Sequence, residues 1–230
     1  MKNIGIIGAM AEETALIRKH LKNEKVEQVI NLTFYQGNFE NVTITLVQSG
    51  IGKVNSTIAA TLLVERFNCD MIINTGSAGA INDKLQVGDI VIADRLAYND
   101  ADSRVFGYDF GQIPQMPKYY LTTELLRNTF VKAAENTNLQ TTVGEIVSGD
   151  SFISSDETKK QIIKHFPNAL VTEMEGAAIA QTAYQFDVPV IVIRSVSDTA
   201  DGEAEKSFDE FIVEAGKSSG YMVLEAIKLL

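Results

Sequence analysis

Residues 71–79 read MIINTGSAG, a short apolar run that passes into glycine, serine and alanine. Similar runs rich in isoleucine and valine recur along the chain, separated by stretches in which apolar residues have helical spacing. This alternation is typical of an α/β fold, in which helices cover both faces of a central sheet. Because open α/β sheets bind ligands beyond the carboxyl ends of their strands, the polar end of the run also indicates a site.

Seven apolar segments bounded by glycine or polar residues have the composition of strands. Asn41 favours a turn between the second and the third segment, which predicts an antiparallel hairpin and therefore a mixed sheet. The predicted strands span Ile4–Gly8, Thr33–Gly37, Val42–Gln48, Met71–Thr75, Asp89–Ala93, Val143–Val147 and Val188–Arg194.

Six further segments have the apolar spacing of helices that flank this twisted sheet. Gly216 and Gly220 interrupt the last of them, and each should weaken a helix by about 1 kcal/mol relative to alanine. We therefore expect close packing against a neighbouring element at these two glycines. The predicted helices span Glu12–Leu21, Val54–Phe67, Thr122–Asn136, Asp156–His165, Glu175–Phe186 and Ser207–Leu230.

Length and charge limit the class of protein. The chain has 230 residues, of which 45% are hydrophobic, so we expect residues 1–230 to form a single domain with one sizeable core. Its 30 acidic and 20 basic residues give a formal net charge of −10, which disfavours nucleic acids and anionic membranes as partners.

Cellular location is predicted from three features. Cys69 is the only cysteine, which excludes an intramolecular disulfide and suits a reducing compartment. The apolar residues 4–11 contain two glycines and lead to no signal-peptide cleavage site. No other stretch approaches the ~20 apolar residues that span a bilayer. We therefore expect a cytoplasmic protein.

Residues 94–120 follow neither helical nor strand periodicity. This segment combines an acidic stretch, NDAD at 99–102, with glycines, aromatic residues and two prolines. A loop of this length inside a compact domain is usually functional or forms an interface.

Several catalytic classes lack their sequence signatures. The glycines at positions 5 and 8 do not form the G-x-G-x-x-G pattern of dinucleotide-binding folds, and two glutamates follow them. His20 and His165 are far apart and belong to no ligand cluster, so we expect no metal. A serine nucleophile would need a G-x-S-x-G elbow, which the chain lacks.

Three carboxylates remain as catalytic candidates: Glu13 after the first strand, Glu175 in the stretch TEMEG, and Asp198 after the last strand. Each also has a structural explanation, because acidic residues at helix N-termini accept hydrogen bonds from free N–H groups. Together in one pocket they would suit cleavage of an N-glycosidic bond. One acid would protonate the departing base, while carboxylates face the cationic sugar and the attacking water.

A series of motifs then identifies a family resemblance that extends from Ile4 to the C-terminal helix. The motifs are IGIIGAM at 4–10, SGIGKV at 49–54, NTGSAG at 74–79, FGY at 106–108, SGDSFI at 148–153, EME at 173–175 and SD at 197–198. In this order they resemble the 5′-methylthioadenosine/S-adenosylhomocysteine nucleosidases of the purine nucleoside phosphorylase superfamily. The resemblance implies a nucleoside phosphorylase/hydrolase-like fold, a homodimer, and no metal or organic cofactor.

The resemblance also implies an activity, the hydrolysis of both nucleosides to adenine plus 5-methylthioribose or S-ribosylhomocysteine. By the same resemblance, Asp198 is the acid that protonates adenine N7, and Ser197 orients it. Phe152 would stack on the adenine, and the backbone of Ile153 would bind the edge of the base.

For the sugar, the resemblance assigns positioning and activation of the water to Glu13. Glu175 and the backbone of Met174 would hold the ribose hydroxyls, and Arg194 and Ser77 would complete the polar lining. The 5′ substituent would meet two groups of side chains. They are Met10, Ile51 and Phe208 of the same chain, and Phe106, Tyr108 and Pro114 of the partner subunit, whose loop 103–114 would complete the pocket.

Alternatives remain open. A phosphorylase of the same fold would attack the sugar with phosphate, although Glu13 would then repel the incoming anion. A nucleosidase for another adenine nucleoside, such as an aminofutalosine-type precursor, would use the same pocket, and a nucleoside sensor would bind without turnover. The aromatic loop could also pack on its own core instead of on a partner.

Overall fold

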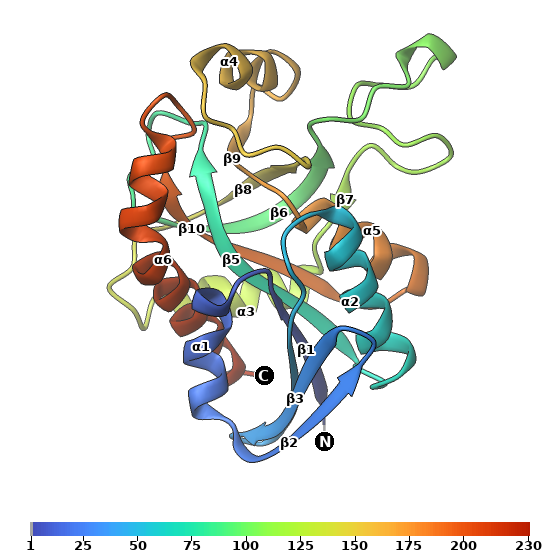
Figure 1. Ribbon diagram of the computed structural model, residues 1–230, viewed down its shortest axis with the longest axis vertical. Helices are drawn as coiled ribbons and strands as arrows, with labels where there is room; N and C mark the ends of the chain where they lie inside the picture. Colours follow the sequence, from blue (N-terminus) through green and yellow to red (C-terminus); the bar gives the residue numbers. More distant parts are fainter. Residues whose placement is uncertain (1) are drawn as a thin grey trace.

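A mixed, twisted sheet runs through the centre of the molecule, and helices cover both of its faces (Figure 1). The computed structural model describes residues 2–230. Its strands are β1 (Asn3–Gly8), β2 (Lys22–Val29), β3 (Leu32–Phe39), β4 (Val42–Gln48), β5 (Met71–Ala80), β6 (Ile90–Tyr98), β7 (Tyr120–Leu121), β8 (Thr141–Ser148), β9 (Ala169–Glu173) and β10 (Val190–Asp198). Its helices are α1 (Ala11–His20), α2 (Lys53–Glu65), η1 (Arg104–Phe106, a 3-10 helix), α3 (Glu124–Ala134), α4 (Asp156–His165), α5 (Gly176–Phe186) and α6 (Ala204–Ile227).

Strand pairing closes part of the sheet into a ring. β5 pairs with both β10 and β9, β10 pairs with β6, and β8 joins β6 to β9. From β5 four further strands extend outward in the order β1, β4, β3 and β2, and the short β7 pairs with β6. β1 is parallel to β4 and β5, whereas β2, β3 and β4 are antiparallel neighbours. The predicted mixed sheet is therefore confirmed, but it is not simply open.

Two hydrophobic clusters lie on opposite faces of the sheet. Ile7 packs into the cluster that includes side chains of α2 and α5, whereas its neighbour Ile6 packs into the cluster that includes α1, α3 and α6. Successive side chains of a strand point to opposite faces, so a strand covered on both sides is apolar without alternation. This burial explains the continuous apolar runs from which the strands were predicted.

All the predicted helices are present, with ends displaced by no more than three residues. Three strands were missed. β2 lies at the edge of the sheet, and most of its polar sequence KNEKVEQV is exposed, so it carries no strand-like alternation. β7 and β9 have only two and five residues. The predicted hairpin is confirmed, since β3 and β4 pair antiparallel across a turn in which Glu40 has a φ of 49°.

The irregular segment is shorter than predicted because β6 continues to Tyr98. Residues 99–119 project from the body of the molecule, with η1 near the tip (Figure 1). Val105 and Phe106 are 85% and 77% exposed, so this part of the loop does not pack on its own core. Across residues 2–230, no helix combines the length and apolar character needed to cross a membrane.

α6 packs against α1 with different closeness at its two glycines. A Cβ atom on Gly216 would lie 2.5 Å from the carbonyl oxygen of Glu12. A Cβ atom on Gly220 would have its nearest neighbour, in Ile17, at 3.6 Å, an ordinary contact. The predicted close packing is therefore confirmed at Gly216, which lets α6 approach the backbone beside Glu13, and is wrong at Gly220.

The two glycines form a matched pair for a stability test. We expect Gly216→Ala to lower the free energy of unfolding by about 1–3 kcal/mol, because the new methyl group forces α6 away from α1. Gly220→Ala should raise it by up to about 1 kcal/mol through helix propensity alone. Urea denaturation of both variants measures the difference, and a Gly216→Ala protein as stable as the wild type would contradict the packing argument.

Candidate active site

A cavity of about 420 Å³ opens where β1, β5 and β10 meet the loops after β4 and β8 and the start of α6. Most of the predicted same-chain site residues line it. The lining consists of Ala9, Met10, Glu13, Ile51, Ser77, Ala78, Gly79, Phe152, Thr172, Glu173, Met174, Glu175, Ser197, Asp198, Glu205 and Phe208. Ile153 instead lines a small adjoining cavity, which shares Phe152, Met174 and Asp198 with the large one.

The sequence predicted that the polar groups lie beyond the ends of the strands, but the two groups around Ser77 and Ser197 lie on the strands themselves. β5 continues through Ser77 to Ala80, and β10 continues through Ser197 to Asp198. The two strands are parallel, but their register shifts between Val196 and Asp198. Such a bulge redirects side chains and is common beside active sites. Here the bulge lies directly before Asp198, whose side chain lines the cavity.

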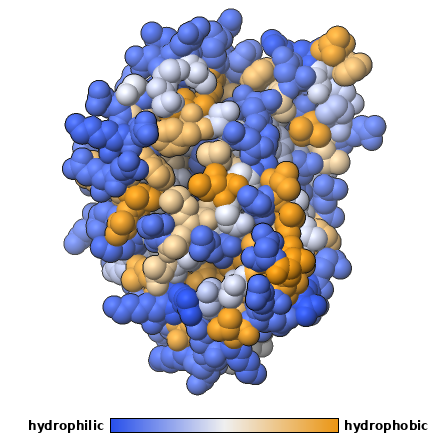
Figure 2. All heavy atoms as spheres, in the orientation of Figure 1, coloured by the Kyte–Doolittle hydropathy of each residue, from blue (hydrophilic) through white to orange (hydrophobic). Residues whose placement is uncertain are grey.

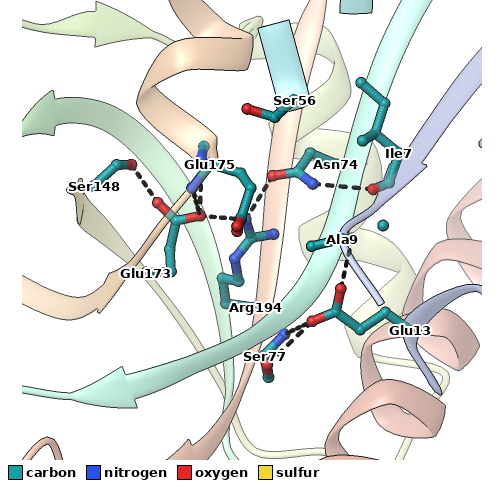
Figure 3. A network of polar contacts seen from close by, with 12 residues as sticks. Ile7, Ala9, Glu13, Ser56, Asn74, Ser77, Ser148, Glu173, Glu175 and Arg194 are labelled. Atoms are coloured by element: carbon teal, nitrogen blue, oxygen red, sulfur yellow. Dashed lines mark hydrogen bonds and ion pairs between the residues drawn. The ribbon is translucent and has the colours of Figure 1, made fainter. Parts of the chain in front are cut away.

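Glu13 is held by four hydrogen bonds, and Figure 3 shows those with Ala9 and Ser77. Its Oε2 accepts from the N–H groups of Ala9 at 2.7 Å and Met10 at 3.0 Å, and its Oε1 accepts from the N–H of Ser77 at 2.9 Å and its Oγ at 3.1 Å. Since Met10 is the N-cap of α1, Glu13 closes the start of its own helix. A Cβ atom on Gly76 would lie 2.8 Å from Oε1, so the strand passes the carboxylate closely. Glu13 therefore does accept hydrogen bonds from free N–H groups at a helix N-terminus, and the same bonds fix its carboxylate at the cavity.

Arg194 lies behind the cavity and not in its lining. The side chain is 1% exposed, and its Nη2 donates to Asn74 Oδ1 at 2.7 Å and to Glu173 Oε2. Asn74 in turn donates to the carbonyl of Ile7 at 3.0 Å. The same Nη2 lies 3.7 Å from Glu175 Oε2. Arg194 thus supplies a buried positive charge to two carboxylates.

Glu173 is a functional group that the sequence analysis did not single out. It accepts hydrogen bonds from Ser148 Oγ and from the N–H groups of Glu175 at 3.1 Å and Gly176 at 2.8 Å. Glu173 therefore combines an ion pair with Arg194 and a cap for α5 (Figure 3). Its signal was the first acid of the EME motif, two residues before the start of a predicted helix.

Glu175 is the N-cap residue of α5, and its Oε1 accepts a hydrogen bond from the N–H of Gly52 at 2.9 Å. Burial raises the pKa of Glu175, and the nearby charge of Glu173 raises it further. Arg194 and the Gly52 N–H oppose this rise because both favour the ionised carboxylate. A ligand that donates hydrogen bonds to Glu175 would act in the same direction.

Asp198 has the surroundings of a proton donor. The residue is 2% exposed, and its carboxylate accepts hydrogen bonds from the N–H of Ala200 and from Ser197 Oγ, both at 2.9 Å. Burial raises the pKa of Asp198, and these two hydrogen bonds oppose the rise. A raised pKa keeps a larger fraction of the carboxyl group protonated at a given pH, which suits a general acid.

Part of the cavity lining is apolar. Phe152 and Phe208 meet edge to face, with ring centroids 5.6 Å apart, and Met10 and Ile51 lie on the same lining. Glu205 also reaches this lining and was missed. The predicted helix began only at Ser207, so Glu205 lay outside it. Because α6 starts at Ala204, Glu205 lies three residues before Phe208 on the same helix face.

Comparisons of the chain with known proteins show its family. The family model of the phosphorylase superfamily matches residues 3–228. A 5′-methylthioadenosine/S-adenosylhomocysteine nucleosidase of Staphylococcus epidermidis is 48% identical over 220 residues, which is 96% of each chain. The chain belongs to this nucleosidase family of the phosphorylase superfamily.

Solved structures in the nucleosidase family have the same fold. An S-adenosylhomocysteine nucleosidase from Streptococcus pyogenes, solved with 5-methylthiotubericidin, is 44% identical and superposes with a TM-score of 0.96 over 100% of this chain and 97% of that one. The nucleosidase from Neisseria meningitidis, solved with methylthio-immucillin-A, is 41% identical and superposes with a TM-score of 0.98 over the whole of both chains. The resemblance predicted from the motifs is therefore confirmed.

Three residues that the nucleosidase resemblance placed at the site do not line the cavity of their own chain. Phe106 and Pro114 are exposed, and Tyr108 is half-buried, all on the projecting loop. Figure 2 shows apolar atoms at the tip of this loop and along α2 on the same face of the molecule. On α2 the exposed apolar side chains include Val54 and Ile58.

Proposed function

We propose that the protein hydrolyses the N-glycosidic bonds of 5′-methylthioadenosine and S-adenosylhomocysteine, releasing adenine and 5-methylthioribose or S-ribosylhomocysteine. The observation that carries the proposal is the meeting of Glu13, Glu175 and Asp198 in one cavity with an apolar side. Family membership and the similarity to structures solved with methylthio-bearing ligands support the same substrates. A place in methionine salvage and in the cytoplasm belongs to the proposal, and the free buried thiol of Cys69 suits a reducing compartment.

The adenine would occupy the end of the cavity formed by Asp198 and Phe152. Cleavage leaves negative charge on the purine, so a proton delivered to N7 lowers the barrier. Asp198 would deliver it, with Ser197 Oγ holding the carboxyl group at 2.9 Å. Phe152 would stack on the base, and the backbone of Ile153 would bind its edge.

The ribose and the attacking water would lie between Glu175 and Glu13. Cleavage builds positive charge on the sugar, which nearby carboxylates stabilise in a water-poor cavity. Glu175 and the Met174 backbone would hold the hydroxyls, with the buried charge of Arg194 behind them. Glu13 already uses the roughly four acceptor sites of a carboxylate, so Ser77 Oγ would turn to the water and free one site for it.

The charges of the cavity favour water over phosphate as the nucleophile. Among residues 2–230, the lining contains five acidic side chains and no lysine, arginine or histidine. Two like charges ~4 Å apart repel by about 4 kcal/mol at an effective dielectric constant of 20. A phosphate dianion beside Glu13 would meet this repulsion without a lining cation to offset it, which disfavours phosphorolysis.

The active form we propose is a homodimer in which loop 103–114 closes the pocket of the neighbouring subunit. Exposed apolar groups on the loop and on α2 support this assembly, since a monomer would leave them in water. Phe106, Tyr108 and Pro114 would then meet the 5′ substituent opposite Met10, Ile51 and Phe208.

The reaction is tested by incubating the purified protein with 5′-methylthioadenosine, with and without phosphate. We expect adenine and free 5-methylthioribose at the same rate in both cases, identified by chromatography and mass spectrometry. Release of 5-methylthioribose 1-phosphate that depends on phosphate would establish phosphorolysis instead, and binding without release of adenine would establish a sensor.

The shared pocket is tested by mixing two impaired variants. Asp198→Asn lacks the acid, and the double variant Phe106→Ala/Tyr108→Ala lacks the loop side chains. Co-expression places one intact pocket in each mixed dimer, so activity should recover to about a quarter of the wild-type value, since about half of random dimers are mixed.

A matched control for this test combines Asp198→Asn with Glu13→Gln. Both residues belong to the pocket of the same chain, so every pocket in a mixed dimer lacks one of them, and we expect no recovery. The shared pocket is wrong if the loop variant restores no more activity than this control.

A further inference from the structure

A network of polar contacts joins three loops beside the cavity. Lys53 Nζ lies 2.6 Å from Asp100 Oδ2 and 3.6 Å from Asp150 Oδ2. The backbone N–H of Lys53 donates to Asp150 Oδ1 at 2.8 Å, and the N–H of Asp150 donates to Asp100 Oδ2 at 2.9 Å. One side chain thus connects the start of α2 with the segments that follow β6 and β8.

The two connected walls carry substrate-binding groups. On one side, Gly52 precedes Lys53 and donates its N–H to Glu175 at 2.9 Å. Gly52 has a φ of +100°, and a Cβ atom there would lie 3.1 Å from Asp150 Oδ1, so the turn that aims this N–H requires glycine. On the other side, Phe152 follows Asp150 by two residues and lines the cavity.

The ion pairs of Lys53 are expected to affect the position of the loops more than the free energy of folding. The side chains of Lys53, Asp100 and Asp150 are 26%, 29% and 50% exposed in their ion pairs. Exposed ion pairs contribute little free energy of folding. Without the ammonium group, however, two carboxylates would remain adjacent at the junction of the loops, and their repulsion would separate the loops.

We propose that Lys53 is a positioning residue, which through Asp100 and Asp150 holds the Gly52 N–H against Glu175 and the Phe152 loop over the cavity. The ammonium group, together with the backbone hydrogen bonds around it, thereby sets the ribose-binding and the adenine-binding parts of the site relative to each other. This inference rests on the proposed function, in which Glu175 binds the ribose and Phe152 the adenine.

Loss of the Gly52 hydrogen bond has a predictable effect on pH dependence. A hydrogen bond to the ionised form lowers the pKa of a carboxyl group, so its loss raises the pKa of Glu175. The other charged groups that face Glu175 are Glu173, Arg194 and Glu13, and they stay in place. Since Glu175 accepts ribose hydroxyls best when ionised, activity would then appear only at higher pH.

The test compares Lys53→Met with Lys53→Arg and with Lys217→Met, which removes an exposed lysine from α6. For Lys53→Met we expect kcat/KM for 5′-methylthioadenosine to fall about 10- to 100-fold at pH 7, because small misplacements of binding groups have effects of this size. The acid limb of its pH profile should move to higher pH. Lys53→Arg should restore most of the activity, and Lys217→Met should match the wild type.

A second variant separates positioning from folding. Lys53→Met/Asp100→Asn/Asp150→Asn removes the repulsion together with the ammonium group, and it should recover part of the activity that Lys53→Met loses. An unchanged kcat/KM for Lys53→Met would overturn the proposal. So would a loss that leaves the pH profile in place and follows a fall in melting temperature. A wild-type protein that releases no adenine would instead contradict the proposed function itself.

Discussion

Burial of several carboxylates in one cavity is the constraint on which the rest of the structure depends. An ionised carboxylate away from water is strongly destabilised unless hydrogen bonds or a positive charge compensate it. Arg194 supplies the charge from behind the cavity, and Asn74 holds its guanidinium. Backbone N–H groups supply the rest, at the start of α1 for Glu13 and at the start of α5 for Glu173.

The hydrogen bonds that compensate the buried carboxylates also stabilise the fold, so the same residues hold the helices and shape the cavity. Glu13 caps a helix and lines the cavity, so its carboxylate is fixed by the fold before any ligand binds. Gly216 lets α6 pack against the backbone of Glu12 and Glu13, and Gly76 lets β5 pass close to the carboxylate of Glu13. Asp198 has fewer donors than Glu13, so burial raises its pKa. The hydrogen bonds that fix Glu13 and the burial that raises the pKa of Asp198 thus give the two carboxylates different surroundings.

Local patterns in the sequence predicted much of the fold and the three main carboxylates. Strands covered on both faces are continuous apolar runs. Glu13 and Asp198 follow such runs, and Glu175 begins a segment with the apolar spacing of a helix. The edge strand β2 was missed because its exposed residues need no apolar face. The position of Arg194 could not be predicted, since its partner Asn74 lies 120 residues earlier and meets it only when β5 and β10 pair. The closed ring of strands also forms by pairing of strands that are distant in sequence, so no local pattern of apolar residues predicts it.

The central claim is a division of roles, in which Asp198 protonates the leaving base and Glu13 serves the water. It is tested most directly by measuring kcat/KM of Asp198→Asn and Glu13→Gln on 5′-methylthioadenosine and on a 4-nitrophenyl 5-methylthioriboside, whose phenolate departs without a proton. Both variants should lose about 100- to 10,000-fold on the nucleoside, the usual contribution of general acid–base catalysis. On the nitrophenyl substrate, Asp198→Asn should regain most of its rate while Glu13→Gln should not. Equal losses of Asp198→Asn on both substrates would contradict the account.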